Sequence, residues 1–312
     1  MNKILIVGGA GYIGGFLTDT LKTENITVYD NLMYESRFFK DVNFVYGDIR
    51  DKEKLLNIMQ EYDVVIWLAA VVGDGACAID PFLTQTINED CVKWFVDNYN
   101  GKFIYMSTCS VYGINNDLLD EEAPTNPISI YAKTKLAAEQ YIINKYKNHL
   151  IFRLGTLFGV GDTYSRIRLD LVVNILTKKA CMKQPLYVYG GDQWRPLLHV
   201  KDVATAIKFG IDNNIKGLFN LSCGNYTILN IAEEIRLHFP EIVIKYQDLP
   251  FEDLRNYKVK ADKYINLGWA PKYTLKKGIL EIKDIILQNR LKNVDDVIYS
   301  NEVYLNTKLF KL

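Results

Sequence analysis

The sequence predicts an α/β protein in which a doubly wound parallel sheet carries helices on both faces, with a smaller mixed α/β lobe beside it. Three observations lead to this prediction. Short runs of β-branched and aromatic residues alternate with helix-length segments through the first half of the chain, this regularity is lost after about Gly155, and the first run ends in a glycine-rich turn. With 312 residues, 49% of them hydrophobic, the chain is long enough for one large domain or two modest ones.

The strands of the first half are predicted from their composition, since each is a short run rich in valine, isoleucine, phenylalanine or tyrosine. The six runs are residues 3–9, 26–30, 43–48, 63–70, 102–108 and 149–155. Asp80 and Pro81 supply an N-cap and a first helical residue, so a helix is expected from Pro81 to Tyr99. The preceding residues, 71–79, are expected to form a loop at the carboxyl edge of the sheet.

The second half is less regular, and one helix-strand unit in it is expected to return to the main sheet. The expected elements are a loop at 159–170, a helix near 171–180, a strand at 186–190, a turn at 190–196, the returning helix and strand at 201–213 and 217–223, a helix at 228–239, a strand at 241–246 and an amphipathic helix near 276–289. We find no internal repeat and no long linker, so the two lobes are expected to be interwoven.

Composition argues against several classes of function. The 37 basic residues balance 37 acidic ones, so the chain lacks the excess positive charge of most nucleic-acid and membrane-surface binders. No run approaches the roughly 18 apolar residues that a transmembrane helix needs. The five cysteines form no C-x-x-C pair, and the three histidines lack metal-ligand spacing. We therefore expect a cytoplasmic protein with reduced thiols and no metal site, whose partners are neither nucleic acids nor membranes.

The turn after the first strand, GGAGYIG, predicts a dinucleotide site of the Rossmann type. Gly8, Gly11 and Gly14 permit a tight turn and let the backbone approach a pyrophosphate, whose charge is met by amides at the start of a helix. Asp30 ends the second strand, where its carboxylate can accept hydrogen bonds from the adenosine ribose and would repel a 2′-phosphate. NAD is therefore favoured over NADP. The positions expected to line the adenine and ribose side are Asp48, Ile49, Ala69 and Ala70.

A second pattern, YAKTK, places Tyr131 and Lys135 on one face of a helix. An ammonium beside a phenol, reinforced by an oxidised nicotinamide, is expected to lower the pKa of the phenol from about 10, so that a tyrosinate can act as a base near neutral pH. The pattern is common by chance, but here it follows STCSVYG in a chain that also carries the glycine fingerprint. The candidate reacting groups within STCSVYG are Ser107, Thr108, Cys109 and Ser110.

With these motifs the chain resembles the extended short-chain dehydrogenase/reductase family, in particular its NAD-dependent nucleotide-sugar epimerases, dehydratases and dehydrogenases. The resemblance covers nearly the whole chain and is carried by GGAGYIG, YDN, GDIRD, WLAA, STCSVYG, YAKTK, FRLGTLFG and GGDQWRPLLHVKDVA. It implies that Thr108 hydrogen-bonds the reacting sugar oxygen, Tyr131 removes its proton, and Lys135 tunes Tyr131 and holds the nicotinamide ribose while hydride goes to NAD.

The resemblance also implies how the chain is divided and assembled. Residues 1–155, with a return near 196–223, would form the NAD-binding domain, and residues 156–195 and 224–312 the nucleotide-sugar-binding lobe. The helices near Pro81–Tyr99 and Ile130–Lys147 match those that form a homodimer contact in the family. The implied cofactor residues are Gly8, Gly11, Tyr12, Ile13, Gly14, Asp30, Asn31, Asp48, Ile49, Leu68, Ala69, Ala70, Asn88, Tyr131 and Lys135.

On the substrate side, Arg195 matches the arginine that holds the nucleotide diphosphate, and a guanidinium suits two phosphate oxygens. Arg168 and Asn174 are further candidates for that diphosphate, with a core polar contact or a surface ion pair as the alternative. Thr156 stands where galactose-type epimerases usually carry an asparagine. His199 is expected to cap or pack in its turn instead of touching substrate.

The residues after Thr108 depart from one branch of the family. Family dehydratases place an Asp-Glu pair there as acid and base, whereas this chain has Cys109 and Ser110, which are poor substitutes. The expected reaction is therefore oxidation of a sugar C4 hydroxyl to a 4-keto sugar, with a C4 epimerase that returns the hydride to the opposite face as the alternative. The stretches from RLGTLFG to GGDQWRPLLHV resemble enzymes of bacterial surface-polysaccharide synthesis, which implies a GDP-heptose substrate and a role in capsular polysaccharide.

Two other classes of function are considered. A catalytically silent dinucleotide-binding regulator typically loses the tyrosine or the lysine, and this chain keeps Thr108, Tyr131 and Lys135. An enzyme with Cys109 as nucleophile needs a nearby base, and none of the three histidines is close in sequence.

Overall fold

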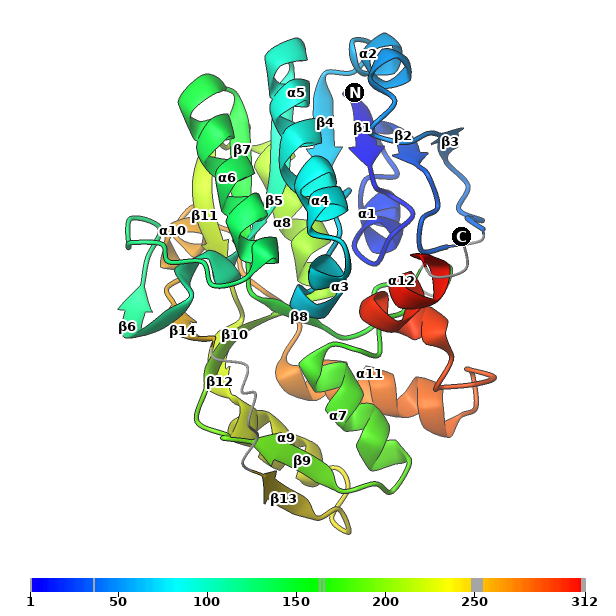
Figure 1. Ribbon diagram of the computed structural model, residues 1–312, viewed down its shortest axis with the longest axis vertical. Coiled ribbons are helices and arrows are strands. Elements are labelled where there is room, and N and C mark those ends of the chain that lie inside the picture. Colours follow the sequence, from blue (N-terminus) through cyan, green and yellow to red (C-terminus); the bar gives the residue numbers. More distant parts are fainter. Residues whose placement is uncertain (1, 36, 163, 165, 248–254, 310–312) are drawn as a thin grey trace.

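The computed structural model of the protein describes residues 2–35, 37–162, 164, 166–247 and 255–309. These residues form a larger lobe around a seven-stranded parallel sheet and a smaller lobe beneath it in Figure 1. The predicted α/β class is confirmed. Residues 163 and 165 of the expected loop 159–170 lie outside the described residues.

The seven strands of the main sheet lie in the order β11-β7-β5-β4-β1-β2-β3, and every neighbouring pair is parallel. Their bounds are β1 Lys3–Val7, β2 Asn25–Asp30, β3 Asn43–Tyr46, β4 Val64–Trp67, β5 Lys102–Thr108, β7 His149–Leu154 and β11 Gly217–Leu221. The first six coincide with the predicted runs, and β11 confirms the predicted return to the main sheet. The order reverses between β1 and β4, and such a switch point leaves a ligand crevice at the carboxyl ends of the strands.

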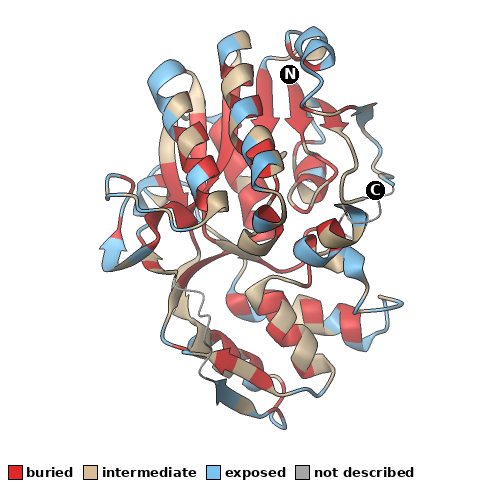
Figure 2. Ribbon diagram, viewed as in Figure 1, coloured by how far each residue is buried: buried red, intermediate tan, exposed pale blue. Residues whose placement is uncertain are grey.

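Side chains that alternate along β1 show how the sheet is covered. Leu5 and Val7 join one buried cluster, whereas Ile4 and Ile6 join the other. The first cluster is closed by α2 (Lys52–Met59), α5 (Cys91–Asn98) and α6 (Ile130–Lys145), and the second by α1 (Gly14–Thr20) and α8 (Val200–Asp212). Figure 2 shows the strands buried between helices whose outer sides are exposed. Burial on both faces explains why these strands read as nearly continuous apolar runs.

One helical segment covers residues 81–98, in agreement with the helix predicted from Pro81 to Tyr99. It consists of α4 (Pro81–Gln85), a π-helical turn (Thr86–Asp90) and α5. The Asp80 side chain caps the segment by accepting a hydrogen bond of 2.9 Å from Leu83 N. Single π turns of this kind often occur at functional sites, and this one contains Asn88.

The expected loop at 71–79 is wrong in part, because Asp74–Ile79 form the short helix α3. Gly73 precedes it at φ +103°, a conformation that favours glycine. Ala76 and Cys77 are buried in the first cluster. A helix of this length is not stable by itself, so tertiary packing, which local sequence does not show, stabilises it.

The smaller lobe packs its helices against two short sheets around a separate apolar core. Its elements are β8 Thr156–Phe158, α7 Val172–Cys181, β9 Leu186–Tyr189, β10 Trp194–His199, β12 Gly224–Thr227, α9 Ile228–Arg236, β13 Ile244–Gln247 and α11 Leu275–Leu287. The expected turn at 190–196 is shorter than predicted, because β10 begins at Trp194. Elements without a prediction are the 3₁₀ turn Cys109–Tyr112, the pair β6 Ile114–Leu119 and β14 Asn256–Val259, α10 Asp262–Ile265, the 3₁₀ turn Val297–Tyr299 and α12 Asn301–Leu309.

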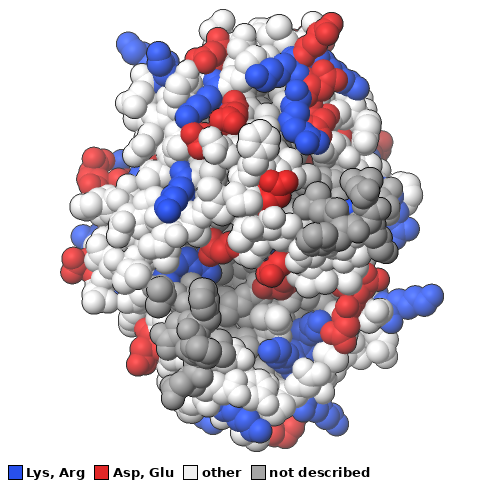
Figure 3. Space-filling model, in the orientation of Figure 1, with Lys and Arg blue, Asp and Glu red and all other residues white. Residues whose placement is uncertain are grey.

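The described residues were also searched for membrane and metal sites. No helix among them is both long and apolar enough to cross a bilayer. They contain no group of three or more His, Cys, Asp or Glu side chains that could hold a metal ion. On the face shown in Figure 3, basic and acidic side chains are intermingled.

A buried ion pair joins α6 to the middle of the sheet. Arg153 of β7 donates to both carboxylate oxygens of Glu139, with the shortest distance, from Nη2 to Oε1, at 2.6 Å. The Ser107 hydroxyl donates to Glu139 Oε2 at 2.5 Å, and Arg153 Nη1 donates to the Tyr112 hydroxyl at 2.8 Å. The two charged residues are 4% and 0% exposed. Because all partners are satisfied, the pair is compatible with burial, but removal of one partner would leave a desolvated charge.

We therefore expect Arg153→Met to lower the free energy of unfolding by about 3–5 kcal/mol, because Glu139 would stay buried without its cation. The double variant Arg153→Met, Glu139→Leu should recover most of that loss, since neither charge remains. Urea unfolding of the wild type, both single variants and the double variant measures this. Additive losses in the double variant would contradict the coupling.

Candidate active site

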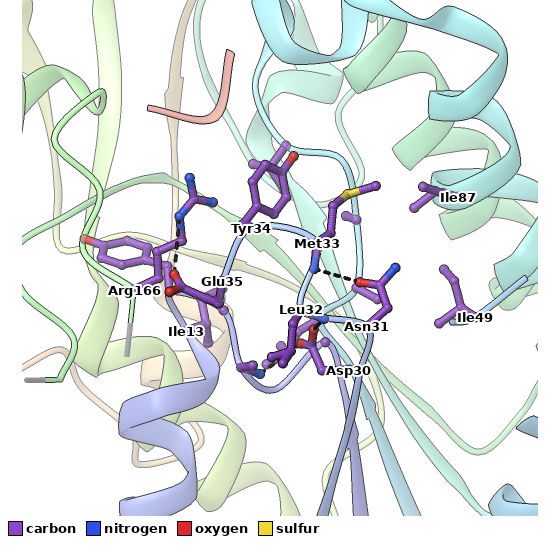
Figure 4. A pocket seen from close by; sticks show the side chains of 18 of the residues that line it. Ile13, Asp30, Asn31, Leu32, Met33, Tyr34, Glu35, Ile49, Ile87 and Arg166 are labelled. Carbon is purple, nitrogen blue, oxygen red and sulfur yellow. Dashed lines mark hydrogen bonds and ion pairs between the residues drawn. The ribbon is translucent and has the colours of Figure 1, made fainter. Parts of the chain in front are cut away.

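A cavity of about 170 Å³ lies at the carboxyl ends of β1, β2 and β4, beside the switch point of the sheet (Figure 4). Most of its wall comes from the segments that follow β1 to β4. The smaller lobe and the C-terminal segment complete the wall. The lining residues are Gly8, Ala10–Ile13, Tyr29–Glu35, Gly47–Ile49, Leu68–Ala70, Val72, Ile87, Leu157, Arg166, Arg168 and Asn301.

The glycine-rich turn is fixed by close backbone contacts. At Gly8, with φ +81°, an added Cβ would lie 2.4 Å from Ala69 N, and at Gly14 it would lie 2.1 Å from Gly9 O. A Cβ at Gly11 would meet only Gly8 O, at 3.5 Å. Gly8 and Gly14 therefore hold β1, β4 and α1 together, whereas Gly11 keeps the cavity wall open where a dinucleotide backbone would approach.

Asp30 faces the cavity at the end of β2 and is held in one orientation. Its Oδ2 accepts from Ala10 N at 3.0 Å and its Oδ1 from Leu32 N at 2.7 Å. Burial raises the pKa of this carboxyl, while these two hydrogen bonds oppose the change. Each carboxylate oxygen can accept a further hydrogen bond, so Asp30 remains suited to a ribose diol.

Asp48 and Asn31 form the neighbouring part of the wall. Asn31 donates to Asp48 at 2.8 Å, and the Arg50 guanidinium bonds both Asp48 oxygens at 2.9 and 2.7 Å. These hydrogen bonds, that with Arg50 above all, lower the pKa of Asp48 to about 2. Asp48 is therefore a fixed anion at the rim of the cavity.

The other predicted cofactor residues divide into two groups. The residues that line the cavity are Tyr12, Ile13, Ile49, Leu68, Ala69 and Ala70. Asn88 does not line the cavity. Its Oδ1 accepts a hydrogen bond from Val71 N at 2.8 Å, and its Nδ2 donates to Val71 O at 2.9 Å. Ile87, its neighbour in the π turn, takes the lining position. Asn88 thus holds the segment after β4 in place.

The three predicted catalytic residues lie together at the end of β5 and on α6. Thr108 is the last residue of β5, and its hydroxyl accepts from Ser110 N at 3.1 Å. The Thr108 side chain is close enough to Tyr131 to lower the pKa of that phenol, although burial raises this pKa by more. Lys135 follows one helical turn later and is 3% exposed. None of the three lines the cavity itself.

The protein's own residues do not lower the pKa of the Tyr131 phenol below its ordinary value, and the predicted lowering includes the charge of an oxidised nicotinamide. Burial raises the Tyr131 pKa above its ordinary value, and burial lowers the pKa of Lys135 to about 7. The Lys135 Nζ lies 4.0 Å from the ring centroid of Tyr105, on β5. A lysine that is half neutral near pH 7 is a weak source of positive charge, so the phenol stays protonated. The sequence pattern shows that Tyr131 and Lys135 share one helix face, but it does not show the burial that sets their pKa values.

The structure explains why Cys109 and Ser110 are poor reacting groups. Cys109 is fully buried, its thiol donates to Arg153 O at 3.2 Å, and burial raises its pKa. The Ser110 hydroxyl pairs with the Tyr257 hydroxyl at 3.1 Å. A buried, protonated thiol is neither a nucleophile nor a general base at neutral pH.

Besides Thr108, the predicted substrate residues lie on β8, on β10, on α7 and in the loop before α7. Arg195 of β10 is 4% exposed and donates to the backbone oxygens of Trp194 and Arg255. Thr156 of β8 pairs with Leu197 of β10. Asn174 is fully buried and bonds the backbone of Gly159 and Arg168, so it organises the loop before α7. Arg168 lines the dinucleotide cavity.

Sequence reasoning did not identify several residues of the site. Tyr34, Glu35, Arg166 and Asn301 line the cavity, and Tyr105 lies under Lys135. The charges at 166 and 168 in the RIRLD stretch could have indicated an anion site, but nothing local places Asn301 there. His199, in contrast, caps α8 as expected by accepting from Lys201 N at 3.2 Å.

Residues 4–222 match the sequence profile of a family described as the NAD dependent epimerase/dehydratase family. The chain belongs to that family. Its membership confirms the predicted resemblance, the enzyme class and NAD as the cofactor, and the cavity fits that assignment through the open Gly11 position and the fixed Asp30 carboxylate. The protein is thus an NAD-dependent enzyme of the nucleotide-sugar epimerase/dehydratase type.

Individual family members agree with this assignment. A protein of Methanocaldococcus jannaschii named "Putative UDP-glucose 4-epimerase" is 30% identical, with 92% of this chain and 99% of that protein covered. The dTDP-glucose 4,6-dehydratase of Streptomyces niveus is 26% identical over 92% of this chain and 94% of that protein. Among solved structures, Pal from Bacillus thuringiensis has 25% identity and a TM-score of 0.78 over 92% of this chain and 99% of that chain. The family therefore accounts for both lobes.

The glycine contacts predict a separation between folding and cofactor binding. Gly14→Ala should destabilise the fold by about 1–3 kcal/mol, because its Cβ meets backbone. Gly11→Ala should leave the melting temperature unchanged and weaken NAD binding by at least about tenfold, since the methyl group enters the cavity. Thermal unfolding and NAD titration of both variants measure this. Wild-type NAD affinity in Gly11→Ala would exclude this turn as the dinucleotide site.

Proposed function

We propose that the protein oxidises the C4 hydroxyl of a nucleotide diphosphate sugar to a 4-keto sugar, without removing water from it. The observation that carries this proposal is the convergence of Thr108, Tyr131 and Lys135 beside the dinucleotide cavity, together with the buried state of Cys109 and Ser110. The same three side chains serve a dehydrogenase that releases the keto sugar and an epimerase that keeps it.

In the proposed mechanism, the Thr108 hydroxyl hydrogen-bonds the sugar oxygen at C4 and orients it toward Tyr131. Tyr131, in its tyrosinate form, takes the proton from that oxygen. Bound NAD supplies the acceptor for the hydride that leaves C4. Lys135 supplies positive charge from the next helical turn and holds the nicotinamide ribose, and Tyr105 keeps its Nζ in place.

The environment of the pair makes proton removal dependent on bound ligands. In the ligand-free chain burial raises the Tyr131 pKa and lowers that of Lys135 to about 7. At neutral pH the phenol is therefore uncharged and the lysine is about half neutral, which reduces the cost of burying the pair. Positive charge added to the site favours the tyrosinate, so the base forms where substrate and cofactor meet.

The residues after Thr108 support oxidation without dehydration. Elimination of water requires one group to protonate the leaving hydroxyl and another to take a carbon-bound proton. The Cys109 thiol donates a hydrogen bond to Arg153 O, and the Ser110 hydroxyl is hydrogen-bonded to the Tyr257 hydroxyl. Neither is a carboxyl group, and the thiol is inaccessible.

The proposed substrate is a nucleotide diphosphate sugar held through Arg195, with Thr156 on the adjacent strand and GDP-heptose of capsular polysaccharide synthesis as the specific candidate. The sequence resemblance through RLGTLFG, RIRLDLVVN and GGDQWRPLLHV supports the sugar class. We also propose a cytoplasmic homodimer, for which the exposed Phe82 of α4 and Ile143 of α6 offer apolar contact area.

The second candidate function is C4 epimerisation. The relative from Methanocaldococcus jannaschii, whose name gives a 4-epimerase, supports it at 30% identity. In that case the keto sugar turns over within the site and takes the hydride back on its other face.

Replacement of the base should separate catalysis from folding. Tyr131→Phe is expected to lower kcat about 10²- to 10⁴-fold, because the proton on the sugar oxygen loses its acceptor, with the melting temperature unchanged. Tyr141→Phe removes an exposed hydroxyl from the same helix and should keep wild-type kcat. Cys109→Ala should keep activity. Full activity in Tyr131→Phe, or its loss only in Cys109→Ala, would contradict the assignment.

Product analysis should identify the reaction. The purified enzyme with NAD and a panel of nucleotide sugars, GDP-mannoheptose included, is incubated in heavy water and followed by NADH absorbance, mass spectrometry and NMR. The proposal expects a keto product with stoichiometric NADH and no deuterium at carbon. A new C4 isomer without deuterium or net NADH would establish the epimerase, and loss of water would refute both. If GDP-mannoheptose yields no 4-keto product, the heptose assignment is wrong.

A further inference from the structure

We propose that Arg166 and Arg168 bind the diphosphate of the dinucleotide and form, together with the glycine-rich turn, the anion site of the cofactor cavity. Neither residue belongs to the GGAGYIG fingerprint. Arg168 is one of the candidates from the sequence for the diphosphate of the sugar nucleotide, and the inference assigns it to the diphosphate of the cofactor instead.

Both guanidiniums belong to the wall of the cavity. Arg166 and Arg168 line it together with Gly11 and Ile13, and they are 6% and 8% exposed. Figure 4 shows Arg166 close to Ile13, with Glu35 beside it. The two arginines thus border the same space as the turn that approaches a pyrophosphate.

The position of Arg168 relative to the reacting residues supports the diphosphate. Its charge is among the influences that lower the pKa of Tyr131, although burial dominates that group. The charge of Arg168 also acts on Tyr12 of the glycine-rich turn. Arg168 is therefore near both the turn that would approach a pyrophosphate and the reacting residue Tyr131, and the diphosphate of a dinucleotide lies between its two nucleosides.

Each guanidinium is anchored by one edge and leaves the other edge available. Arg168 donates from Nε and Nη2 to Asp170, at 3.0 Å each, and Arg166 donates from Nε and Nη2 to Ile298 O, at 3.4 and 3.0 Å. Within the part of the chain that the structure describes, no hydrogen bond is made by Nη1 of either residue. A fixed guanidinium with donors still available is well suited to phosphate oxygens.

Residues 298–301 hold the segment that carries the two arginines in place. Asp170 also accepts from Asn301 N at 2.8 Å, and Leu169 N donates to Tyr299 O at 2.9 Å. The Asn301 side chain donates to Val72 O at 2.8 Å. Residues 166–170 are therefore held against the larger lobe before any ligand binds, so little conformational entropy is lost when a phosphate is bound.

The charges at this wall favour an anionic ligand. Burial and the charge of Arg168 lower the pKa of Arg166, which shows two like charges close together in a desolvated place. Asp170 neutralises one of them. Helix α1 has only seven residues, so its dipole adds little. The positive charge that remains attracts the negatively charged diphosphate.

Glu35 is a carboxylate of the wall that competes for Arg166, and its Oε1 lies 3.6 Å from Arg166 Nε. Burial raises the pKa of Glu35 to about 7, while Arg166 and Arg37 oppose this and Asp30 adds to it. Tyr299 also lies within reach of its charge. Below pH 7 the neutral Glu35 leaves Arg166 to the ligand, whereas above pH 7 the carboxylate pairs with Arg166 and repels phosphate.

The test is calorimetric titration of the cofactor-free protein with NAD, ADP-ribose and adenosine. Arg166→Gln and Arg168→Gln should each weaken NAD and ADP-ribose binding by roughly 10- to 100-fold, the usual effect of a lost charged hydrogen bond. Adenosine binding should change less than about twofold. Arg236→Gln, which removes an exposed arginine of α9 that pairs with Glu233, is the charge-matched control and should bind all three as the wild type does.

Other outcomes would overturn the proposal. Equal losses for adenosine would mean that the arginines only shape the cavity, losses for NAD but not ADP-ribose would place them at the nicotinamide end, and unchanged affinities would exclude contact. If a glutamine variant does not fold, Arg166→Lys and Arg168→Lys retain the charge and should show smaller losses with the same ligand preference.

A pH series supplies an independent readout. NAD affinity of the wild type should fall between pH 6 and 8.5, because ionised Glu35 competes for Arg166, and Glu35→Gln should abolish this dependence. A pH dependence that persists unchanged in Glu35→Gln would contradict the placement of Arg166 on the phosphate. None of these titrations requires a sugar substrate, so their results are independent of the proposed reaction.

Discussion

The buried ion pair between Arg153 and Glu139 is the interaction on which the catalytic half of the molecule depends. It joins β7 to α6, and through Ser107 and Tyr112 it reaches β5 and the turn that follows. Thr108 comes directly after Ser107, and Lys135 lies one turn before Glu139 on α6. The ion pair thus sets the spacing between strand end and helix at which the reacting hydroxyl and phenol meet.

The sequence was sufficient for the parts of the fold that local patterns determine. Buried parallel strands are continuous apolar runs, so β1, β2, β4 and β5 could be located, and Asp80 with Pro81 located a helix. The pair β6 and β14 could not be found, because its strands come from residues more than 130 positions apart. Helices α3 and α12 are short, and they are stabilised by contact with each other, which no local pattern contains.

In the candidate site too, features set by local sequence could be predicted, whereas features set by tertiary contacts could not. The glycine turn, Asp30 and the Tyr131–Lys135 pair were recognised because their chemistry depends on spacing along the chain. The state of that pair was not, because it depends on burial and on Tyr105 from another strand. Asn88 was assigned to the cofactor, yet its amide bonds backbone. Asn174 was a candidate for the substrate diphosphate with a core polar contact as the alternative, and its amide also bonds backbone. An asparagine's type reveals its hydrogen-bonding capacity but not which partner uses it.

The origin of the cavity wall bears on how the chain can be dissected. Residues 1–155 contain the whole glycine fingerprint, but β11, Arg168 and Asn301 come from later parts of the chain. An isolated amino-terminal fragment would lack an edge strand and one side of its cofactor cavity. Exchange of substrate lobes between relatives would likewise alter the cofactor site. The two lobes are separate in shape, but they are not interchangeable modules.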